Sequence, residues 1–270
     1  MPDYGIRLKD IGKICVVTLH RPERLNAFNE IMFTKLKKVT DKLKKELPRA
    51  IVITGSGESA FSAGFDVNPD NPQVAGLLKA VEKHDEKPVR DMIMKLREAV
   101  DGFVSLPVPI IAAVNGKAYG GGAELATRCD MRVMDPHAEF CFSELKLGLM
   151  PDWGGGATLI GLIGPSKATD LILTTRKINA EESLSIGLVN RISESGNSLL
   201  EAIHIAESIS QNGPQATRSS LEMIRASRNL TLDATLNLEL DKAVSLIASG
   251  ECIHGISAFL TKQKPTFPDI

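Results

Sequence analysis

Three consecutive glycines, Gly120 to Gly122, most constrain what this chain can fold into. They follow a β-branched segment at residues 110–114 and precede an apolar segment from about Ala123 to Cys129. The first segment predicts a buried strand and the second a helix, so the glycines link the two. Glycine lets the backbone approach a ligand closely and leaves its amides free to donate hydrogen bonds. Amides at the start of a helix also favour negative charge, because the helix dipole is positive there.

A second glycine-containing loop follows another predicted strand, at residues 50–54. It includes Gly55 and Gly57 and continues to Asp66. Neither loop has the GxxxxGK[ST] arrangement of a phosphate cradle, and each taken alone could be no more than a tight turn. Two such loops whose amides converged on one oxygen would form an oxyanion hole, which stabilises the negative charge that develops in acyl chemistry.

Predicted strands alternate with predicted helices early in the chain and are absent from its last part. Short apolar or β-branched runs predict strands at residues 15–19, 50–54, 110–114, 131–134 and 139–142. Apolar residues at helical spacing predict helices at 27–46, 77–104 with an interruption near Pro88, 123–129, 159–173, 180–186, 199–211, 215–225 and 232–247. This pattern indicates an α/β core over residues 1–197 and a helical region over residues 198–270.

Composition argues against several classes of protein. The net charge is -1 over 270 residues, so no overall field attracts nucleic acid or an anionic membrane. No apolar run approaches the roughly 20 residues that a membrane span needs, and the polar N-terminus is unlike a signal peptide. The four cysteines are scattered and form no CxxC pair, so they indicate neither a metal site nor redox chemistry. A cytoplasmic protein is expected, although a processed organellar chain would look the same.

Four motifs, in order along the chain, resemble those of the crotonase superfamily, the enoyl-CoA hydratase/isomerase group. They are HRPERLNAF at residues 20–28, AFSAGFD at 60–66, the glycine-rich block at 109–130 and FLTKQKP at 259–265. The resemblance implies a spiral of repeated ββα units, with C-terminal helices that build a homotrimer or a homohexamer. It also implies an acyl-CoA thioester as substrate, no metal, no cofactor beyond CoA itself, and oxyanion donors at the amides of Ala63 and Gly121.

Two glutamates occupy the positions at which hydratases of this family carry their catalytic pair. Adding water to a 2-enoyl thioester needs a base that activates water at C3 and an acid that protonates C2, and two carboxyl groups can do both. The resemblance gives Glu124 the water and Glu144 the proton for C2. The alternative for each is a solvated surface residue, which the apolar flanks of Glu124 disfavour.

Asp152 departs from the pattern of the best-known hydratases, which have glycine there. Several isomerases of the superfamily, including dienoyl-CoA isomerases, place an aspartate at this position as an acid/base. The alternative is a capping role, because Asp152 precedes a glycine-rich turn and a predicted helix. A second departure is Ser143, which stands before Glu144 where the family usually has proline.

The family binds CoA near its opening motif and its first oxyanion loop, often with a C-terminal lysine of the same or a neighbouring subunit. Carried onto this chain, the substrate-binding candidates are Arg24, Leu25, Ala60, Gly64, Phe65, Asp66, Lys262 and Lys264. For the basic residues, solvated surface charge is an equal alternative. The segment at residues 66–109 borders the acyl pocket in this family, so we expect it to set the preferred chain length.

The sequence therefore predicts an enoyl-CoA hydratase, with a double-bond isomerase that uses Glu144 and Asp152 as the main alternative. A minor alternative is RNA binding, since Lys35, Lys38, Lys42 and Lys45 share one face of a predicted helix and an RNA-binding relative carries a similar row. A solvated helix face explains the same lysines, and the net charge disfavours nucleic acid.

Overall fold

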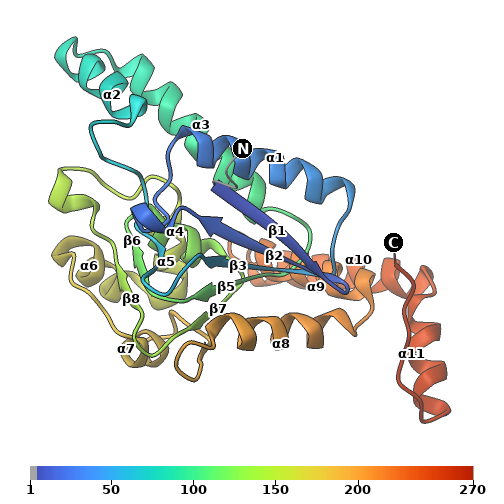
Figure 1. Cartoon of the computed structure of the whole chain (residues 1–270). Helices are drawn as coiled ribbons and strands as arrows, with labels where there is room; N and C mark the ends of the chain where they lie inside the picture. The colour runs from blue at the N-terminus through green and yellow to red at the C-terminus, as the bar shows by residue number, and fades with distance from the viewer. Residues whose placement is uncertain (1–4, 270) are drawn as a thin grey trace.

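Two sheets form the centre of the computed structural model, which describes residues 5–269 (Figure 1). The larger sheet has the order β1-β2-β3-β5-β7-β9, in which only the β1–β2 pair is antiparallel. Its strands are Gly5–Ile11, Ile14–His20, Ala50–Gly55, Ile110–Val114, Met131–Met134 and Arg191–Ile192. The smaller sheet is parallel, has the order β4-β6-β8 and consists of Ala60–Ser62, Lys117–Tyr119 and Glu139–Cys141.

Successive segments of the chain alternate between the two sheets. The strands β3, β5 and β7 lie in the large sheet, and β4, β6 and β8, which follow them in turn, lie in the small one. After β4 come α2 (Pro72–Glu82) and α3 (Glu86–Val104), and after β6 comes α4 (Gly121–Arg128). The chain therefore winds as repeated ββα units, and the expected α/β fold is confirmed.

Helices cover both faces of the large sheet, which explains why its central strands are apolar throughout. The alternate side chains Val52, Ile111 and Val133 pack with Ile205 of α8 (Ser198–Ser210). Their neighbours on the strands pack on the other face, with α1 (Glu30–Lys45), α3 and α4. Parallel strands buried on both faces read as continuous apolar runs, as β3 and β5 do.

The remaining helices lie mostly between β8 and β9 or after α8. They are α5 (Gly155–Ile163), α6 (Pro165–Thr174), α7 (Ala180–Ser185), α9 (Pro214–Ala226), α10 (Leu232–Ala248) and α11 (Glu251–Leu260), with single 3₁₀ turns η1 (Pro22–Arg24) and η2 (Glu144–Leu147).

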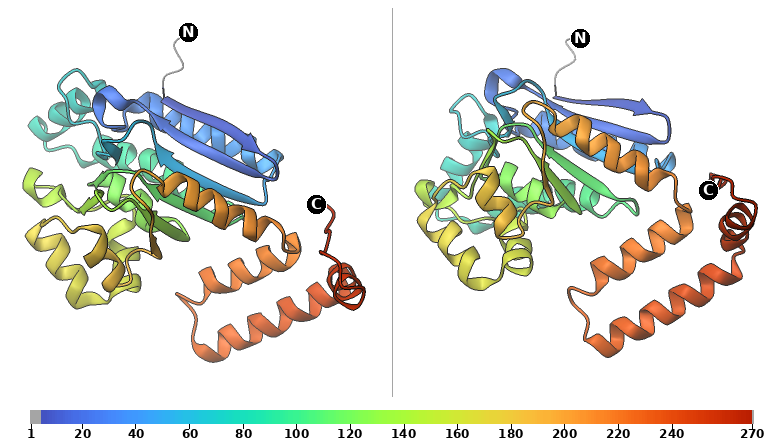
Figure 2. Two further views of the ribbon diagram at one scale, coloured as in Figure 1. Left: turned by 60° about the horizontal axis from the view of Figure 1, so that its bottom comes forward. Right: turned by 90° about the horizontal axis from the view of Figure 1, so that it is seen from below.

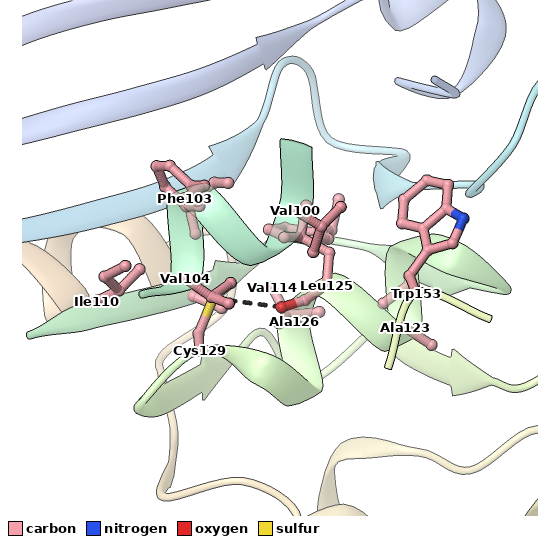
Figure 3. Close-up of a cluster of buried hydrophobic side chains, with 14 of the residues drawn as sticks. Val100, Phe103, Val104, Ile110, Val114, Ala123, Leu125, Ala126, Cys129 and Trp153 are labelled. Atoms are coloured by element: carbon pink, nitrogen blue, oxygen red, sulfur yellow. Dashed lines mark hydrogen bonds between the residues drawn. The ribbon is translucent and has the colours of Figure 1, made fainter. Parts of the chain in front are cut away.

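A cluster of apolar side chains from α3 and α4, including Val100, Phe103 and Leu125, packs α4 against α3 (Figure 3). Cys129 is buried in this cluster, and burial raises the pKa of its thiol to about 12, so it is unreactive.

The C-terminal helices divide into two groups. The helix α8 packs on the large sheet, whereas α9, α10 and α11 extend away from both sheets (Figure 2). The chain then returns to the body, where Arg49 donates to the carbonyl oxygens of Phe267 and Pro268 at 2.9 and 3.0 Å. The predicted boundary between residues 197 and 198 thus precedes a helix of the core, and it remains a prediction.

Several expected boundaries are wrong. The helix expected from residue 27 begins at Glu30, because Asn29 caps it by accepting from the amide of Met32. The break expected near Pro88 lies earlier, where Asp85 caps α3. Pro88 falls in the first turn of α3, where backbone amides have no helical partner to lose. The strands β1, β4, β6 and β9 were not expected, and α11 lies in the region expected to be helical although no helix was predicted over its residues.

No single helix within residues 5–269 is long and apolar enough to cross a membrane, and only α10 and α11 taken together, with a bend of 71° between them, meet that test.

Candidate active site

The triple glycine is required by close contacts on every side of the start of α4. Gly120 has φ 52° and ψ -129°, a conformation open to glycine alone. A β-carbon at Gly121 would lie 2.7 Å from the ring of Trp153, and one at Gly122 would lie 2.1 Å from the carbonyl oxygen of Ser62. The amide of Gly121 is the first of α4, so it has no acceptor within the helix.

The loop after β4 touches the start of α4 directly. Gly64 has φ 85°, and a β-carbon there would lie 2.6 Å from the amide nitrogen of Gly121. Ala63 and Gly121, the two expected oxyanion donors, consequently line one cavity.

The amide of Ala63 already has a partner in this structure, because it donates to the carbonyl oxygen of Leu25 at 2.9 Å. Leu25 and Asn26 have φ of 50° and 56°, left-handed values that are uncommon outside glycine. The side chain of Asn26 holds this turn by donating to the carbonyl oxygen of Ala60 at 2.8 Å. Of the two expected donors, only the amide of Gly121 has no backbone acceptor among the described residues.

The cavity has a volume of about 140 Å³ and a mixed lining. The lining includes residues of the two loops and the carboxylic residues Glu124, Glu144 and Asp152. Apolar residues of α2 and α3 and of the segment after η2 form the rest. Small, mostly apolar sites with a few converging polar groups are typical of binding sites for organic substrates.

Glu124 is fully buried and held by the turn that precedes α5. Its carboxylate accepts from the amides of Asp152, Trp153 and Gly155 at 3.1, 3.0 and 2.8 Å. Burial raises the pKa of Glu124, although these three hydrogen bonds oppose the shift. The prediction that Glu124 is not a solvated surface residue is confirmed.

Glu144 is also buried, but its surroundings are different. Glu144 is the first residue of η2 and is 8% exposed. Neither of its carboxylate oxygens accepts a hydrogen bond from the described residues. Burial, and then the negative charges of Glu124 and Asp152, raise the pKa of Glu144 to about 7. A carboxyl group of this kind can carry a proton at neutral pH and give it up during a reaction.

The capping role considered for Asp152 is wrong. The helix α5 begins at Gly155, and its N-cap is Gly154, whose φ of 88° suits glycine and which makes no side-chain cap. Asp152 instead lines the cavity, where burial raises the pKa of its carboxyl group and Arg97 partly offsets that rise. Three carboxyl groups with raised pKa values thus share one small cavity.

Comparison with known proteins agrees with this geometry. A sequence model described as Enoyl-CoA hydratase/isomerase matches residues 10–269. The chain belongs to the enoyl-CoA hydratase/isomerase family.

Named relatives match along nearly their whole length. The chain is 31% identical to a short-chain-enoyl-CoA hydratase of Clostridium acetobutylicum, covering 96% of each protein. It is 33% identical to a crotonyl-CoA hydratase of Syntrophomonas wolfei, covering 97% of each. Among solved structures, an enoyl-CoA hydratase from Bacillus anthracis superposes with a TM-score of 0.89 at 31% identity, over 97% of this chain and 98% of that one.

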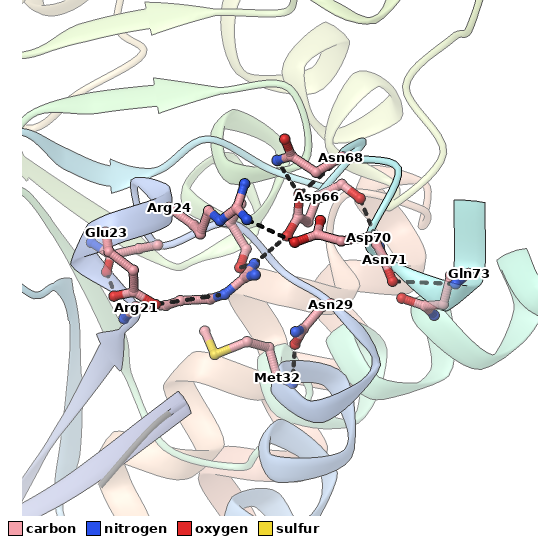
Figure 4. Close-up of polar contacts among 12 residues, drawn as sticks. Arg21, Glu23, Arg24, Asn29, Met32, Asp66, Asn68, Asp70, Asn71 and Gln73 are labelled. Carbon is pink, nitrogen blue, oxygen red and sulfur yellow. Dashed lines mark hydrogen bonds and ion pairs between the residues drawn. The ribbon is translucent and has the colours of Figure 1, made fainter. Parts of the chain in front are cut away.

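Two of the residues assigned to CoA by resemblance to this family are held in ion pairs (Figure 4). Asp66 is buried and accepts from Arg21 at 2.5 Å and from Asn68 at 2.6 Å. Burial alone would raise the pKa of Asp66, but these hydrogen bonds hold it below its ordinary value. Arg24 donates to Asp70 at 2.8 Å in an exposed pair. Asp66 thus fixes the loop, whereas the exposed Arg24 can exchange its partner for a phosphate.

The other assigned residues are divided between two ends of the molecule. Phe65 lines the cavity. The carbonyl oxygen of Leu25 accepts from the amide of Ala63, Gly64 follows Ala63, and the carbonyl oxygen of Ala60 accepts from Asn26. Lys262 and Lys264 follow α11, which lies at the opposite end of the molecule from α4 and α5 (Figures 1 and 2). A single chain does not bring these lysines to the cavity, so their role stays a prediction that requires a neighbouring copy.

Sequence reasoning missed two residues that support the site. The ring of Trp153 packs edge-on against that of Phe28, with 5.4 Å between the ring centroids, and it lies directly against Gly121. Arg128, at the end of α4, donates to the carbonyl oxygen of Trp153 at 2.7 Å and pairs with Asp101 of α3. A basic residue in the last turn of the helix was its only signal in the sequence.

The remaining expectations concern other ligands. Of the lysine row on α1, Lys38, Lys42 and Lys45 are exposed, as both a solvated face and an RNA-binding face require. Within residues 5–269, no group of three His, Cys, Asp or Glu side chains could hold a metal ion.

Proposed function

We propose that this enzyme adds water reversibly to a 2-trans-enoyl-CoA and forms a 3-hydroxyacyl-CoA. The observation that carries the proposal is the pair of buried glutamates beside the start of α4. Glu124 is fixed by three backbone amides, whereas the carboxylate oxygens of Glu144 accept no hydrogen bond from residues 5–269 and its pKa is about 7. General base and general acid catalysis require one carboxyl group that takes up a proton and a second that can release one near neutral pH.

The proposed reaction transfers one proton at each end of the double bond. Glu124 takes a proton from water as the water oxygen forms a bond to C3. The electrons of the double bond move to the thioester oxygen, and the enolate formed there accepts from the amide of Gly121 at the positive end of α4. Glu144 then gives its proton to C2 and the thioester carbonyl re-forms.

Ala63 completes the oxyanion hole in this proposal once its amide is released from Leu25. The hydrogen bond to be broken is of ordinary length, 2.9 Å, and the turn that supplies its acceptor is held in left-handed conformations. Such conformations cost free energy and persist only where the surroundings impose them. We therefore expect bound thioester to displace the Leu25 carbonyl from Ala63.

The second candidate function is isomerisation of the double bond. It is favoured by one observation, the position of Asp152 in the cavity with a raised pKa and without a capping role. In this reaction Glu144 and Asp152 would move a proton between carbons of the acyl chain without adding water.

The proposal includes no cofactor beyond CoA, a homotrimeric or homohexameric enzyme and a cytoplasmic location. The hydratases named above support the CoA thioester as substrate. Support for assembly comes from the exposed apolar side chains of α9 to α11.

Three variants distinguish hydration from isomerisation. We expect purified enzyme to hydrate crotonyl-CoA, and Glu124→Gln and Glu144→Gln each to lower kcat by several orders of magnitude. Asp152→Asn should be mild, and it is the matched control because it also replaces a cavity carboxyl group by an amide. If Asp152→Asn abolishes turnover while Glu124→Gln retains it, isomerisation is the function.

A further inference from the structure

A positively charged side chain is buried beneath the helix that presents the expected oxyanion donor. Arg132 lies on β7, a strand whose other residues are apolar, and it is 2% exposed. Met134, two positions further along the strand, packs in the core on the α4 side of the large sheet, so Arg132 points to that side as well. Arginine is almost never fully buried unless it is paired, so the position of this residue needs an explanation.

The guanidinium group binds the carboxyl end of α4. Its Nη1 donates to the carbonyl oxygens of Thr127 and Cys129 at 3.2 and 2.6 Å, and Figure 3 shows Cys129 at this end of the helix. Its Nε donates to the carbonyl oxygen of Leu188 at 2.6 Å. The last carbonyl groups of a helix have no amide partner within it. Arg132 therefore supplies hydrogen bonds that α4 lacks at this end.

No carboxylate neutralises this charge. In the part of the chain that the structure describes, no acidic side chain forms an ion pair with Arg132, and Asp130 pairs instead with Arg225 at 2.6 Å. Burial lowers the pKa of the Arg132 guanidinium to about 10, which leaves it charged at neutral pH. The other basic residue at this end of α4, Arg128, is paired with Asp101. Arg132 thus places a positive charge without a carboxylate partner on the carboxyl end of α4.

This charge acts on the oxyanion because α4 is short. The helix has 8 residues and is therefore about 12 Å long. The partial negative charge at its carboxyl end is close enough to offset part of the positive end beside Gly121. A buried guanidinium on the terminal carbonyl oxygens reverses the sign of that contribution. With an effective dielectric constant of about 20, a unit charge about 15 Å away changes the equilibrium for forming an anion by nearly tenfold.

We propose that Arg132 stabilises the enolate formed at Gly121, by acting through α4 as a positive charge on the carboxyl end of that helix. Arg132 does not line the cavity, so it is a positioning residue. The inference rests on the proposed function, because it takes the amide of Gly121 as the oxyanion donor.

The test titrates an enolate on the enzyme. Acetoacetyl-CoA is a thioester that loses a carbon-bound proton, and its enolate absorbs in the near ultraviolet, so absorbance of the saturated complex against pH gives the pKa of the bound compound. Arg132→Gln keeps a hydrogen-bond donor but no charge, and it should raise that pKa by about one unit. Arg132→Lys keeps the charge and should retain most of the stabilisation.

The outcomes separate this inference from the proposed function. If the unmodified enzyme binds acetoacetyl-CoA without lowering its pKa relative to water, the oxyanion hole of the proposed function is wrong. If the unmodified enzyme lowers that pKa and Arg132→Gln lowers it equally, the proposed function stands and the inference is overturned. A pKa that rises as much in Arg132→Lys as in Arg132→Gln would also overturn it, because a role confined to shape and packing would then explain both variants.

The matched control is Arg49, a second buried guanidinium that donates to backbone carbonyl oxygens. Its acceptors include the carbonyl oxygens of Asn212 and Phe267, and none of them belongs to α4. Arg49→Gln should therefore leave the pKa of bound acetoacetyl-CoA unchanged. An equal rise in Arg49→Gln and Arg132→Gln would contradict an effect that acts through α4.

A variant that retains Arg132 decides the question if the Arg132 variants do not fold. Asp130→Asn removes a negative charge that acts on Arg132 and keeps an acceptor for the amide of Ile110 and for Arg225. It should lower the pKa of bound acetoacetyl-CoA by about half a unit, a smaller effect because Asp130 is partly exposed and water screens its charge. An unchanged or higher pKa in Asp130→Asn would overturn the proposal.

Discussion

At the scale of single residues, Glu144 is the group whose proton decides the pH dependence of the reaction. Hydration needs one proton shared by the two glutamates, with Glu124 ionised and Glu144 protonated. Dehydration starts with that proton on Glu124 and with Glu144 ionised. Because the pKa of Glu144 is about 7, the pair loses its proton as the pH rises through neutrality.

We accordingly predict that kcat/KM for hydration falls as the pH rises above about 7. The kcat/KM for dehydration should fall over the same pH range. Isomerisation instead needs Glu144 as a base, so its kcat/KM would rise through the same pH range. Steady-state rates in both directions from pH 5 to 9 check this. A rate that increases with pH across neutrality would contradict the proposed hydration.

The same carboxyl group should weaken the fold at high pH. Its pKa is raised from 4.5 to about 7 by burial, so folding stability that is present below pH 4.5 is lost as the pH rises through 7. The loss amounts to about 3 kcal/mol for a shift of this size. Glu144→Gln should therefore gain about that much stability relative to the unmodified protein between pH 4 and pH 8, as measured by urea unfolding. Parallel pH profiles for the two proteins would be inconsistent with a buried, unpartnered carboxyl group.

Gly155 is the residue on which the position of Glu124 depends most. A β-carbon there would lie 2.2 Å from the α-carbon of Glu124, so the helix α4 and the turn before α5 would have to separate. We expect Gly155→Ala to destabilise the protein by about 1–3 kcal/mol and to lower kcat about a hundredfold. Gly161, in the same helix α5, has open space around it, and Gly161→Ala is the control that should leave both quantities nearly unchanged. Equal effects of the two changes would show that close contact at Gly155 is not the cause.

At this scale the sequence was informative about residue types and less so about partners. The apolar flanks of Glu124 predicted its burial, and the triple glycine predicted a helix start at a ligand site. Nothing in the sequence indicated that the amides of residues 152–155 bind Glu124, because that contact joins segments about thirty positions apart. The capping role of Asp152 failed because Gly154 alone can adopt the conformation that begins α5.

At the scale of elements, Arg128 connects α4, α3 and the turn before α5. It donates to the carbonyl oxygen of Trp153 at 2.7 Å, and the neighbouring amides of that turn hold Glu124. We regard Arg128 as a positioning residue, since it does not line the cavity.

The change Arg128→Met should release the turn and deprive Glu124 of some of its amide partners. The pKa of Glu124 would then rise, because burial would no longer be opposed by hydrogen bonds. We expect kcat to fall about tenfold to a hundredfold with little change in KM, and the acidic limb of the pH profile to move to higher pH. Arg176→Met, which removes exposed ion pairs with Asp170 and Glu182, is the control. A loss of stability without any change in the acidic limb would leave Arg128 a purely structural role.

The elements themselves were predictable where their pattern was long enough. The helices α1, α3, α8 and α10 have several turns of apolar periodicity, and each was expected near its observed position. The strands β4 and β6 have three residues each, which is too short for a period-two pattern. The helix α11 has the same kind of pattern, since Ile253, Ile256 and Leu260 recur at i, i+3 and i+7, so its spacing favours a helix that was nevertheless missed.

At the scale of the whole molecule, exposed apolar side chains are denser along the C-terminal helices than along the rest of the described chain. The helix α10 has no buried residue, and the exposed apolar side chains of α9 to α11 and their connections are Ile224, Leu230, Leu232, Leu236, Leu240, Val244, Ile247, Ile253, Ile256, Phe259 and Leu260. A patch of this extent marks an interaction surface. Further copies of this chain are the partner we propose, in agreement with the expected homotrimer or homohexamer.

The double change Leu236→Glu and Leu240→Glu should therefore dissociate the protein into monomers, because each glutamate would place a charge in an apolar interface. Sedimentation velocity at micromolar concentration measures the result. The control is Leu173, which is 64% exposed on α6 and lies outside the C-terminal helices. Leu173→Glu should leave the assembly intact. A monomeric unmodified protein would refute this use of the C-terminal helices.

The sequence predicted the division into an α/β core and a helical region because strands are absent from the last part of the chain. It could not predict where that region points, because α9 is held by contacts between distant segments, such as the ion pair of Arg225 with Asp130. The two C-terminal lysines, Lys262 and Lys264, could be assigned to CoA only by resemblance.

The measurement that tests the central claim most directly is the fate of water oxygen when the enzyme acts on crotonyl-CoA. The reaction is run in water labelled with heavy oxygen, and the thioester products are analysed by mass spectrometry. If Glu124 delivers water to C3 and Glu144 protonates C2, the product is 3-hydroxybutanoyl-CoA that carries the label in its hydroxyl group, and Glu124→Gln forms almost none. Products that differ from the substrate only in the position of the double bond, without label, would contradict the account.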